Sequence, residues 1–455
     1  MFPHSIAISL VVLSVYSACA QTIAGGSGHT LAICSDGTLR SWGDNDFGQL
    51  GNGSTTDFIL PGLVNGLAGV RQVEAGQFFS LALLNDGSVW AWGRNVQGEI
   101  GDGTTTDRHS PVQVIGLSDV VEIAAGPNHS LAVKNDGTVW AWGRNSAGQL
   151  GDGTNQSRTE PVQVVGLSGM IAVAAGGAHS LALKDDGTVW SWGLGTTGQL
   201  GNGSPSSTET PVQVSALSNV ASIAAGTSHS LALKNDSTVR TWGTNTNGQL
   251  GVDSILYSSV PIEPVGLTNI TKIVSAHDHS LALVDDGTIR AWGINSFGQL
   301  GDNSTEDESI AVQVISLPVV FAIEAGDFHS MALDNDGSLW CWGLNSTGQL
   351  GDGTEQDSHL PVQATSLCPM ATGHDDPLQP DPVSSYPNPT SGKFTVCLGS
   401  QRGELRIRNA LGQVVFQSAS IGPVAELDLS SDADGIYLLT FRNSPTSFVF
   451  RVIKE

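Results

Sequence analysis

The chain has 455 residues, enough for a large repeat array with a small appended domain, and carries 43 Asp and Glu against 19 Lys and Arg. Its formal charge of −24 argues against nucleic acid and membrane surfaces as partners, because both attract clustered cationic side chains. Only 14% of the residues are charged while 56 are Gly and 11 are Trp, which is typical of many short strands and tight turns.

The N-terminus predicts an export signal. An apolar stretch over residues 6–16 is followed by an A-x-A pattern that ends at Ala20. We therefore expect a signal peptide over residues 1–20, cleaved between Ala20 and Gln21. Lipidation of Cys19 is the alternative, but Tyr16 stands three positions before it, where a small aliphatic residue would be needed.

Four cysteines lie beyond the signal peptide, and an exported protein can join them in up to two disulfides. They are Cys34, Cys341, Cys368 and Cys397. None has C-x-x-C spacing, so metal and thioredoxin-like sites lose support. The pairing stays open, and buried free thiols are the alternative.

Residues 21–368 form a repeat array. A Trp-Gly pair recurs every 50 residues without insertion, at Trp42, Trp92, Trp142, Trp192, Trp242, Trp292 and Trp342. Each repeat holds four apolar segments, in the third copy about residues 121–125, 129–134, 138–142 and 161–165. Four short strands per repeat of this length predict a seven-bladed β-propeller of four-stranded blades.

Two local patterns refine this prediction. Asp136-Gly137 joins the second and third segments, and Asp-Gly is a strong hairpin signal because Gly tolerates a positive φ. Ser237 replaces that Gly in one copy and predicts a strained turn. Trp140 and Trp142 are two residues apart on one strand, so both face the same side and are expected to pack between blades.

The repeat, quoted from residues 129–164 as HSLAVKNDGTVWAWG, GQLGDGT and PVQV, resembles that of the regulator of chromosome condensation family. The resemblance covers about residues 22–368 and implies a seven-bladed propeller. Relatives include nuclear exchange factors for a GTPase and secreted bacterial inhibitors of β-lactamases. The signal peptide and the acidic charge argue against a GTPase partner here, and fold alone does not fix the function.

One face of the propeller is the candidate binding surface. Strands alternate in direction, so the loops between strands one and two and between strands three and four emerge together, opposite the Asp-Gly hairpins. These loops vary most between repeats, and variable loops on a rigid scaffold commonly carry recognition, although neutral drift is the alternative. The candidate residues are Phe47, Phe58, Phe78, Arg94, Arg108, Arg144, Arg158, Tyr257, Asp278, Phe297 and Phe328.

Catalytic and metal motifs are weak. A histidine recurs at one position, as His29, His129, His179, His229, His279 and His329, with Phe79 in the second repeat. Equivalent positions in different blades lie too far apart to share one ion at ~2 Å, so we interpret these histidines as structural and bonded to the backbone. The Gly-Asp-Gly-Thr loops lack the EF-hand pattern, and no nucleotide loop, G-x-S-x-G or H-E-x-x-H occurs. We predict no catalytic residues, no metal and no cofactor.

A Pro- and Asp-rich linker over residues 369–385 precedes a C-terminal domain at 386–455, whose alternating apolar residues predict a small β-sandwich. Its motifs resemble a type A sorting domain of the Bacteroidetes type IX secretion system. The motif residues are Pro387, Asn388, Pro389, Gly392, Gly412, Gly435 and Tyr437. The resemblance implies recognition by secretion machinery at the outer membrane, then release or surface attachment. An ordinary adhesive sandwich is the alternative.

Taken together, the sequence predicts an all-β, monomeric, secreted or cell-surface protein that binds a protein or glycan without catalysis. A hydrolase or lyase acting in the central channel, and an inhibitor of a foreign enzyme, are the alternatives. The first blade has only Thr22-Ile23-Ala24 for its innermost strand. We expect the segment 367–372 to lie beside it and to help close the ring.

Overall fold

The structure is a computed structural model that describes residues 22–34, 37–365 and 367, and then 384–386, 393–397, 403–409, 413–421, 424–428, 435–443 and 446–454. The chain divides into two compact units, Gln21–Met370 and Ala371–Glu455 with Met1–Ala20. The predicted signal peptide and its cleavage site at Ala20 and Gln21 lie outside the described residues. Among the described residues there is no helix long and apolar enough to cross a membrane.

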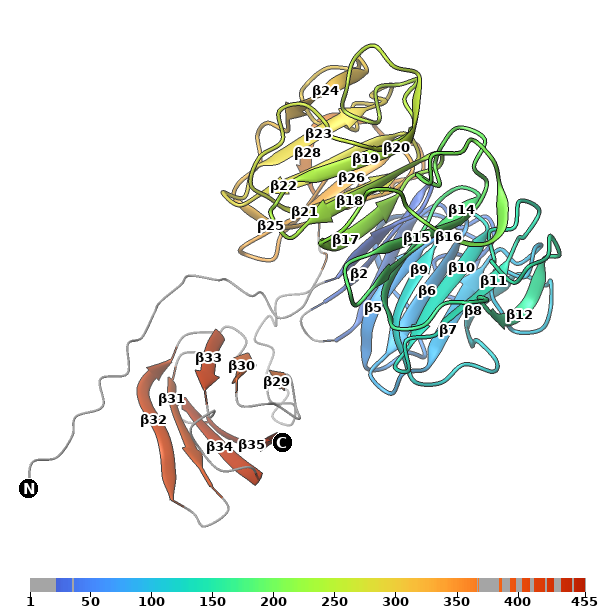
Figure 1. Ribbon diagram of the computed structural model, residues 1–455. Coiled ribbons are helices and arrows are strands. Elements are labelled where there is room, and N and C mark those ends of the chain that lie inside the picture. Colours follow the sequence, from blue (N-terminus) through green and yellow to red (C-terminus); the bar gives the residue numbers. More distant parts are fainter. Residues whose placement is uncertain are drawn as a thin grey trace, which may run out of the picture. The chain divides into compact units, whose positions relative to one another are not determined.

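The first unit consists of seven four-stranded antiparallel sheets that follow one another along the chain, coloured from blue to orange in Figure 1. Blades 1 to 3 are β1 (Ile23–Gly25), β2 (His29–Ile33), β3 (Leu39–Gly43) and β4 (Phe58–Leu63); β5 (Val70–Ala75), β6 (Phe79–Leu84), β7 (Val89–Gly93) and β8 (Arg108–Gln113); β9 (Val120–Ala125), β10 (His129–Lys134), β11 (Val139–Gly143) and β12 (Arg158–Gln163). Blades 4 and 5 are β13 (Met170–Ala175), β14 (His179–Lys184), β15 (Val189–Gly193) and β16 (Thr208–Gln213); β17 (Val220–Ala225), β18 (His229–Lys234), β19 (Val239–Thr244) and β20 (Tyr257–Ile262). Blades 6 and 7 are β21 (Ile270–Ala276), β22 (His279–Val284), β23 (Ile289–Gly293) and β24 (Glu308–Gln313); β25 (Val320–Ala325), β26 (His329–Asp334), β27 (Leu339–Gly343) and β28 (Ser358–Gln363).

The predicted strands of the third repeat agree closely with the first three strands of blade 3, and the fourth begins earlier than expected. Arg158 already pairs with Gly143 across a bulge, so β12 starts at Arg158 rather than near residue 161. The hairpin positions behave as predicted. Gly137 has a φ of 75°, and Ser237 is held at a φ of 63°, which is unfavourable for a residue with a Cβ.

The hydrophobic core lies between blades, because the paired tryptophans pack there as predicted. Trp142 is fully buried in a cluster with Leu81 and Val89 of the preceding blade and Ile123 of its own blade, and Trp140 packs against the same cluster. Burial of such a side chain contributes on the order of 4 kcal/mol, from ~150 Å² at ~25 cal/mol/Å². Each blade is therefore stable only beside its neighbours.

The ring closes through the same contacts that join the other blades. Trp42 of blade 1 is buried in a cluster with Met331, Leu333 and Leu339 of blade 7. Its indole Nε1 donates to the carbonyl of Gln349 (2.9 Å). Sheet β1-β2-β3-β4 forms blade 1, and its described part contains no strand beside β1 contributed by the segment after β28.

The C-terminal end of the propeller nevertheless returns to blade 1. The carbonyl oxygen of Leu367 lies 3.4 Å from Cys34 Sγ, while residues 368–372 are outside the described part. Cys34 is disulfide-bonded. Cys341 is a free thiol, and burial raises its pKa above the usual range, so it is an inert core residue.

The second unit contains two antiparallel sheets, as expected for an all-β domain (Figure 1). Their strands are β29 (Ser384–Tyr386), β30 (Lys393–Cys397), β31 (Gly403–Arg408), β32 (Val414–Ile421), β33 (Val424–Asp428), β34 (Gly435–Asn443) and β35 (Thr446–Lys454). The sheet orders are β29-β30-β33 and β32-β31-β34-β35. Gly435 begins β34 and Tyr437 lies within it. The remaining motif residues Pro387, Asn388, Pro389, Gly392 and Gly412 lie outside the described residues.

Candidate ligand-binding face

The two sets of variable loops lie at one end of every blade. In blade 3, Gly143 pairs with both His129 and Arg158, so the ends of three strands meet there. The Asp-Gly hairpin closes beyond the pair Val133 and Val139, at the opposite end. We call the first end, formed in blade 3 by residues 126–128 and 144–157 and in the other blades by their equivalents, the loop face.

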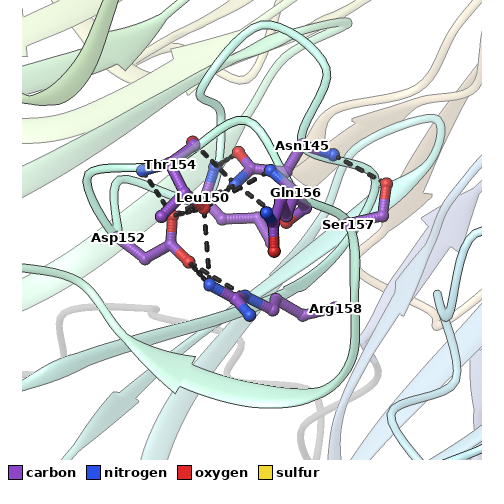
Figure 2. A network of polar contacts seen from close by, with 7 residues as sticks. All are labelled: Asn145, Leu150, Asp152, Thr154, Gln156, Ser157 and Arg158. Carbon is purple, nitrogen blue, oxygen red and sulfur yellow. Dashed lines mark hydrogen bonds and ion pairs between the residues drawn. The ribbon is translucent and has the colours of Figure 1, made fainter.

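The long loop of this face is fixed by one buried asparagine, as Figure 2 shows for blade 3. The Nδ2 of Asn145 donates to Asp152 Oδ1 (3.1 Å) and to the carbonyls of Thr154 (2.9 Å) and Gln156 (3.1 Å). Its Oδ1 accepts from the amide of Leu150 (2.9 Å). Because this side chain satisfies four groups at once, the loop backbone is held in one conformation.

The same asparagine recurs at the equivalent position of most other blades, which gives the loop face a repeated rigid frame. The copies are Asn45, Asn95, Asn245, Asn295 and Asn345, and Gly195 replaces the residue in blade 4. The 50-residue spacing of these asparagines is the sequence signal for the common loop frame. The variable side chains therefore stand on a fixed backbone, which suits recognition.

Two of the predicted arginines are used within their own loops. Arg158 donates from Nε (2.9 Å) and Nη2 (2.6 Å) to Asp152 Oδ2, as seen in Figure 2. Arg108 forms the equivalent ion pair with Asp102 (2.5 Å). Each arginine side chain is one-third exposed, so these pairs contribute little stability but do order the loop. A role for Arg108 and Arg158 in ligand binding stays a prediction.

Three other predicted residues make no aromatic pair. Phe58 and Tyr257 are the first residues of the outermost strands β4 and β20, with exposed fractions of 41% and 53%. Arg144 is exposed and donates from Nε to Ser146 Oγ (3.0 Å). The structure thus places Phe58 and Tyr257 at the outer end of their blades.

The other four phenylalanines form two pairs across blade boundaries. Phe47 of blade 1 lies 5.2 Å from Phe78 of blade 2, measured between ring centroids. Phe297 of blade 6 lies 5.5 Å from Phe328 of blade 7. All four are half-buried, so part of each ring faces solvent. Arg94 completes the first pair, with its Cζ 5.8 Å and 5.7 Å from the two ring centroids.

Asp278 is linked to the second pair through His277, whose Nδ1 lies 3.4 Å from Asp278 Oδ2, and is held by its neighbours. Its Oδ1 accepts from Gln249 Nε2 (3.0 Å), and its Oδ2 accepts from Asn247 Nδ2 (3.3 Å). The adjacent His277, which sequence reasoning missed, has a φ of 28° and lies 4.6 Å from the Phe328 ring. The sequence signal that could have pointed to His277 is Ala276, since the other six repeats have Gly at that position. A Cβ there displaces the turn, because equivalent glycines have less than 3 Å of room.

A cavity of about 360 Å³ occupies the central channel, lined by first strands and by the turns of the loop face. It contains the carboxyl groups of Glu74, Glu122 and Glu324, and one cation, Lys272, which lies 3.6 Å from Glu324. Burial raises the pKa of Glu74 to about 8 and that of Glu122 to about 7. The cavity therefore holds carboxyl groups that are partly protonated near neutral pH.

The recurring histidines are structural, as predicted, but their partners are hydroxyl groups rather than backbone atoms. His179 Nε2 bonds to Ser230 Oγ of the next blade (2.9 Å), and Ser230 donates to the carbonyl of Gln199 (3.0 Å). The serine hydrogen is thus used, so the histidine carries its proton on Nε2. His329 bonds to Thr30 in the same way where the ring closes (3.0 Å). Burial lowers the pKa of these histidines to about 3 or 4, so they stay neutral.

One group of three carboxylates in the described part has oxygen atoms within 4.8 Å of one another, formed by Asp44, Asp46 and Asp57. Asp57 Oδ1 accepts from the amide of Asn45 (2.8 Å), and Asp44 Oδ1 accepts from the amide of Asp46 (3.0 Å). Asp46 and Asp57 are exposed. These contacts are those of a turn, in line with the interpretation of the loops from sequence.

Comparison with known proteins assigns both units. The regulator of chromosome condensation (RCC1) repeat matches residues 36–83, 86–133 and 136–183, and the RCC1-like domain matches residues 163–376. The propeller belongs to the RCC1 repeat family. The secretion system C-terminal sorting domain matches residues 384–455, which indicates secretion by the type IX system with release or attachment at the cell surface.

Solved structures support this assignment. The RCC1 propeller is similar to yeast RCC1 (Prp20) bound to Kap60, at 26% identity and a TM-score of 0.64 over 71% of this chain and 82% of that one. A structure of Prp20p from Saccharomyces cerevisiae, studied for its binding to Gsp1p and histones, gives 26% identity and a TM-score of 0.65 over 71% and 84%. Human WBSCR16 gives 26% and 0.63 over 69% and 87%.

Curated relatives match over single repeats. The E3 ubiquitin-protein ligase HERC2 of Homo sapiens is 51% identical over 47 residues, which are 10% of this chain and 1% of that protein. The ultraviolet-B receptor UVR8 of Arabidopsis thaliana is 41% identical over 51 residues, 11% of this chain and 12% of that protein. The chain thus matches only a small part of the length of these relatives.

Proposed function

We propose that this secreted RCC1 propeller binds a protein or glycan ligand through its loop face and does not act as an enzyme. The observation that carries the proposal is the pairing of half-exposed phenylalanines on a rigid frame at one end of the blades. Aromatic side chains are enriched at binding interfaces and bring large contact area at low entropic cost. A backbone fixed by the repeated asparagines needs no ordering when a ligand binds.

The repeats themselves supply the test variants. Phe47→Gln with Phe78→Asn converts the boundary between blades 1 and 2 to the residues that the next boundary carries, Gln97 and Asn128. The same exchange at Phe297 and Phe328 converts the second pair. Because both replacements already occur at equivalent positions, the fold should be retained.

The matched control is Phe58→Arg, since Arg108 and Arg158 occupy the equivalent position in blades 2 and 3. Wild-type and variant full-length chains are compared by quantitative capture from culture medium and on a glycan array. We expect the four-residue variant to lose the ligands captured by the wild type and the Phe58 variant to keep them. Unchanged capture by the four-residue variant contradicts the proposal.

Catalysis in the channel is the second candidate, favoured by the raised pKa values of Glu74 and Glu122, because carboxyl groups that titrate near neutrality suit general acid or base chemistry. It predicts turnover of a small substrate that Glu74→Gln or Glu122→Gln abolishes. The loop-face variants would leave that turnover intact. Inhibition of a foreign enzyme is the special case of the first proposal in which the captured protein is itself a catalyst.

A further inference from the structure

The seven boundaries between blades can be compared position by position on the loop face. At four of them, a residue from the long loop of one blade contacts a residue from the first turn of the next. Asn247 donates to Asp278 (3.3 Å) at one boundary, and Thr347 Oγ1 donates to the carbonyl of Gly28 (3.0 Å) at another. Phenylalanine occupies both positions at the boundaries of blades 1 and 2 and of blades 6 and 7.

The first phenylalanine pair already holds a cation of the chain. The Arg94 guanidinium lies over both Phe47 and Phe78, within the 6 Å at which the negative faces of aromatic rings attract cations. Its Nη1 also donates to Asn128 Oδ1 (3.4 Å). This internal contact demonstrates what kind of group such a pair accommodates at this position of the fold.

The second pair has the same rings but a different residue at the position of Arg94. Leu344 stands there, and among the described residues no Lys or Arg of the chain lies over Phe297 or Phe328. The ring of His277 packs against Phe328 from one side, 4.6 Å between centroids. The pair therefore retains aromatic surface that solvent reaches and that no Lys or Arg of the described part covers.

Two carboxyl groups lie near this second pair. Asp278 and Asp327 lie in the first turns of blades 6 and 7, directly before His279 and Phe328 in the chain. Asp278 is fixed by Gln249 and Asn247, and its Oδ2 also lies 3.4 Å from Nδ1 of His277, the residue that packs against Phe328. Burial raises the pKa of Asp327, which disfavours its charged form and leaves Asp278 as the carboxylate of the proposed site. At the first pair, by contrast, the chain supplies its own positive charge.

We propose that Phe297, Phe328 and Asp278 form a site for a cationic side chain, arginine or lysine, presented by a protein partner. The rings supply cation–π attraction, and the fixed carboxylate supplies the ion pair. This inference rests on the proposed function and selects a protein rather than a glycan as the ligand, because neutral sugars carry no cation.

The test uses the full chain and N-acetyl-arginine amide as the probe, titrated by ligand-observed NMR at low salt. N-acetyl-citrulline amide is the control probe, since it has nearly the same shape without the charge. We expect saturable binding of the arginine probe and none of the citrulline probe at the same concentrations. Equal binding of the two probes, or binding of neither, overturns the inference.

Matched variants locate the site. Phe328→Leu keeps apolar volume but removes the ring, and Asp278→Asn removes the charge; each should weaken the arginine probe about two- to fivefold. Phe78→Leu makes the same change at the pair that Arg94 covers and should leave binding of the arginine probe unaltered. Equal loss in Phe78→Leu and Phe328→Leu contradicts the assignment, and thermal unfolding of each variant verifies the fold.

The two proposals fail separately. If the arginine probe does not bind but capture still depends on the phenylalanines, the loop face binds a ligand without this cation site. If the probe binds but no macromolecule is captured through the loop face, the cation site stands and the proposed function is wrong. Capture of glycans alone contradicts the choice of a protein partner.

Discussion

Removing one buried hydroxyl should destabilise the propeller by an amount that depends on which boundary carries it. Ser230 is fully buried, accepts from His179 Nε2 (2.9 Å) and donates to the carbonyl of Gln199 (3.0 Å). In Ser230→Ala that carbonyl keeps its bond from Trp242 Nε1 (2.9 Å). The His179 N–H, however, loses its partner. Moving the proton to Nδ1 gives no relief, because that atom has no hydrogen-bond partner either.

The boundary between blades 2 and 3 provides the matched control. Ser130 donates to the carbonyl of Glu99 (3.1 Å), which Trp142 Nε1 also contacts (2.8 Å), but Phe79 replaces the histidine there. Ser130→Ala therefore removes one hydrogen bond and leaves no buried donor unsatisfied. We expect a loss of about 1 kcal/mol for Ser130→Ala and about 2–4 kcal/mol for Ser230→Ala, since an orphaned buried N–H adds about 1–3 kcal/mol.

The measurement is equilibrium unfolding in urea followed by tryptophan fluorescence. All 11 tryptophans lie between residues 42 and 342, so the signal reports the propeller and not the C-terminal domain. Equal losses for the two variants would refute the reasoning, because they would show that the histidine proton is not held by Ser230. His179→Phe in the Ser230→Ala background should recover the difference, as Phe79 does naturally.

Four further outcomes are expected. The six buried histidines, with pKa values lowered to about 3 or 4 from 6.5, bind protons only on unfolding, so stability should fall as pH drops below about 6.5. Glu74, with its pKa raised from 4.5 to about 8, is protonated in the folded state, so stability should also fall toward pH 8, and Glu74→Gln should reduce that decline in unfolding measured against pH, while Glu122, with its pKa raised to about 7, keeps part of it. Cys34→Ser should lower the free energy of unfolding by about 2–4 kcal/mol while Cys341→Ala changes no disulfide, and peptide mapping without reduction should find Cys34 paired and Cys341 free. Ser237→Gly should stabilise the propeller by up to about 1 kcal/mol, because Gly adopts the positive φ without strain; a loss in the same urea experiment would contradict this.

Much of the candidate site followed from the sequence, and its internal organisation did not. The spacing of the loops placed Phe47, Phe78, Phe297 and Phe328 on one face. Their pairing depends on how adjacent blades are rotated about the axis, which brings the long loop of one blade to the first turn of the next. That rotation is a property of the ring and is not contained in the pattern of a single repeat.

The sequence by itself determined the number of blades, the strands within them and the end at which the variable loops emerge, because strand periodicity and hairpin residues are local signals that seven copies reinforce. Only the tertiary structure decided which charged groups remain available to contact a ligand. It paired Arg158 with Asp152, covered the first phenylalanine pair with Arg94 and packed His277, not an arginine, against the second. These outcomes depend on distances between residues of different loops and blades, which packing sets and sequence spacing does not.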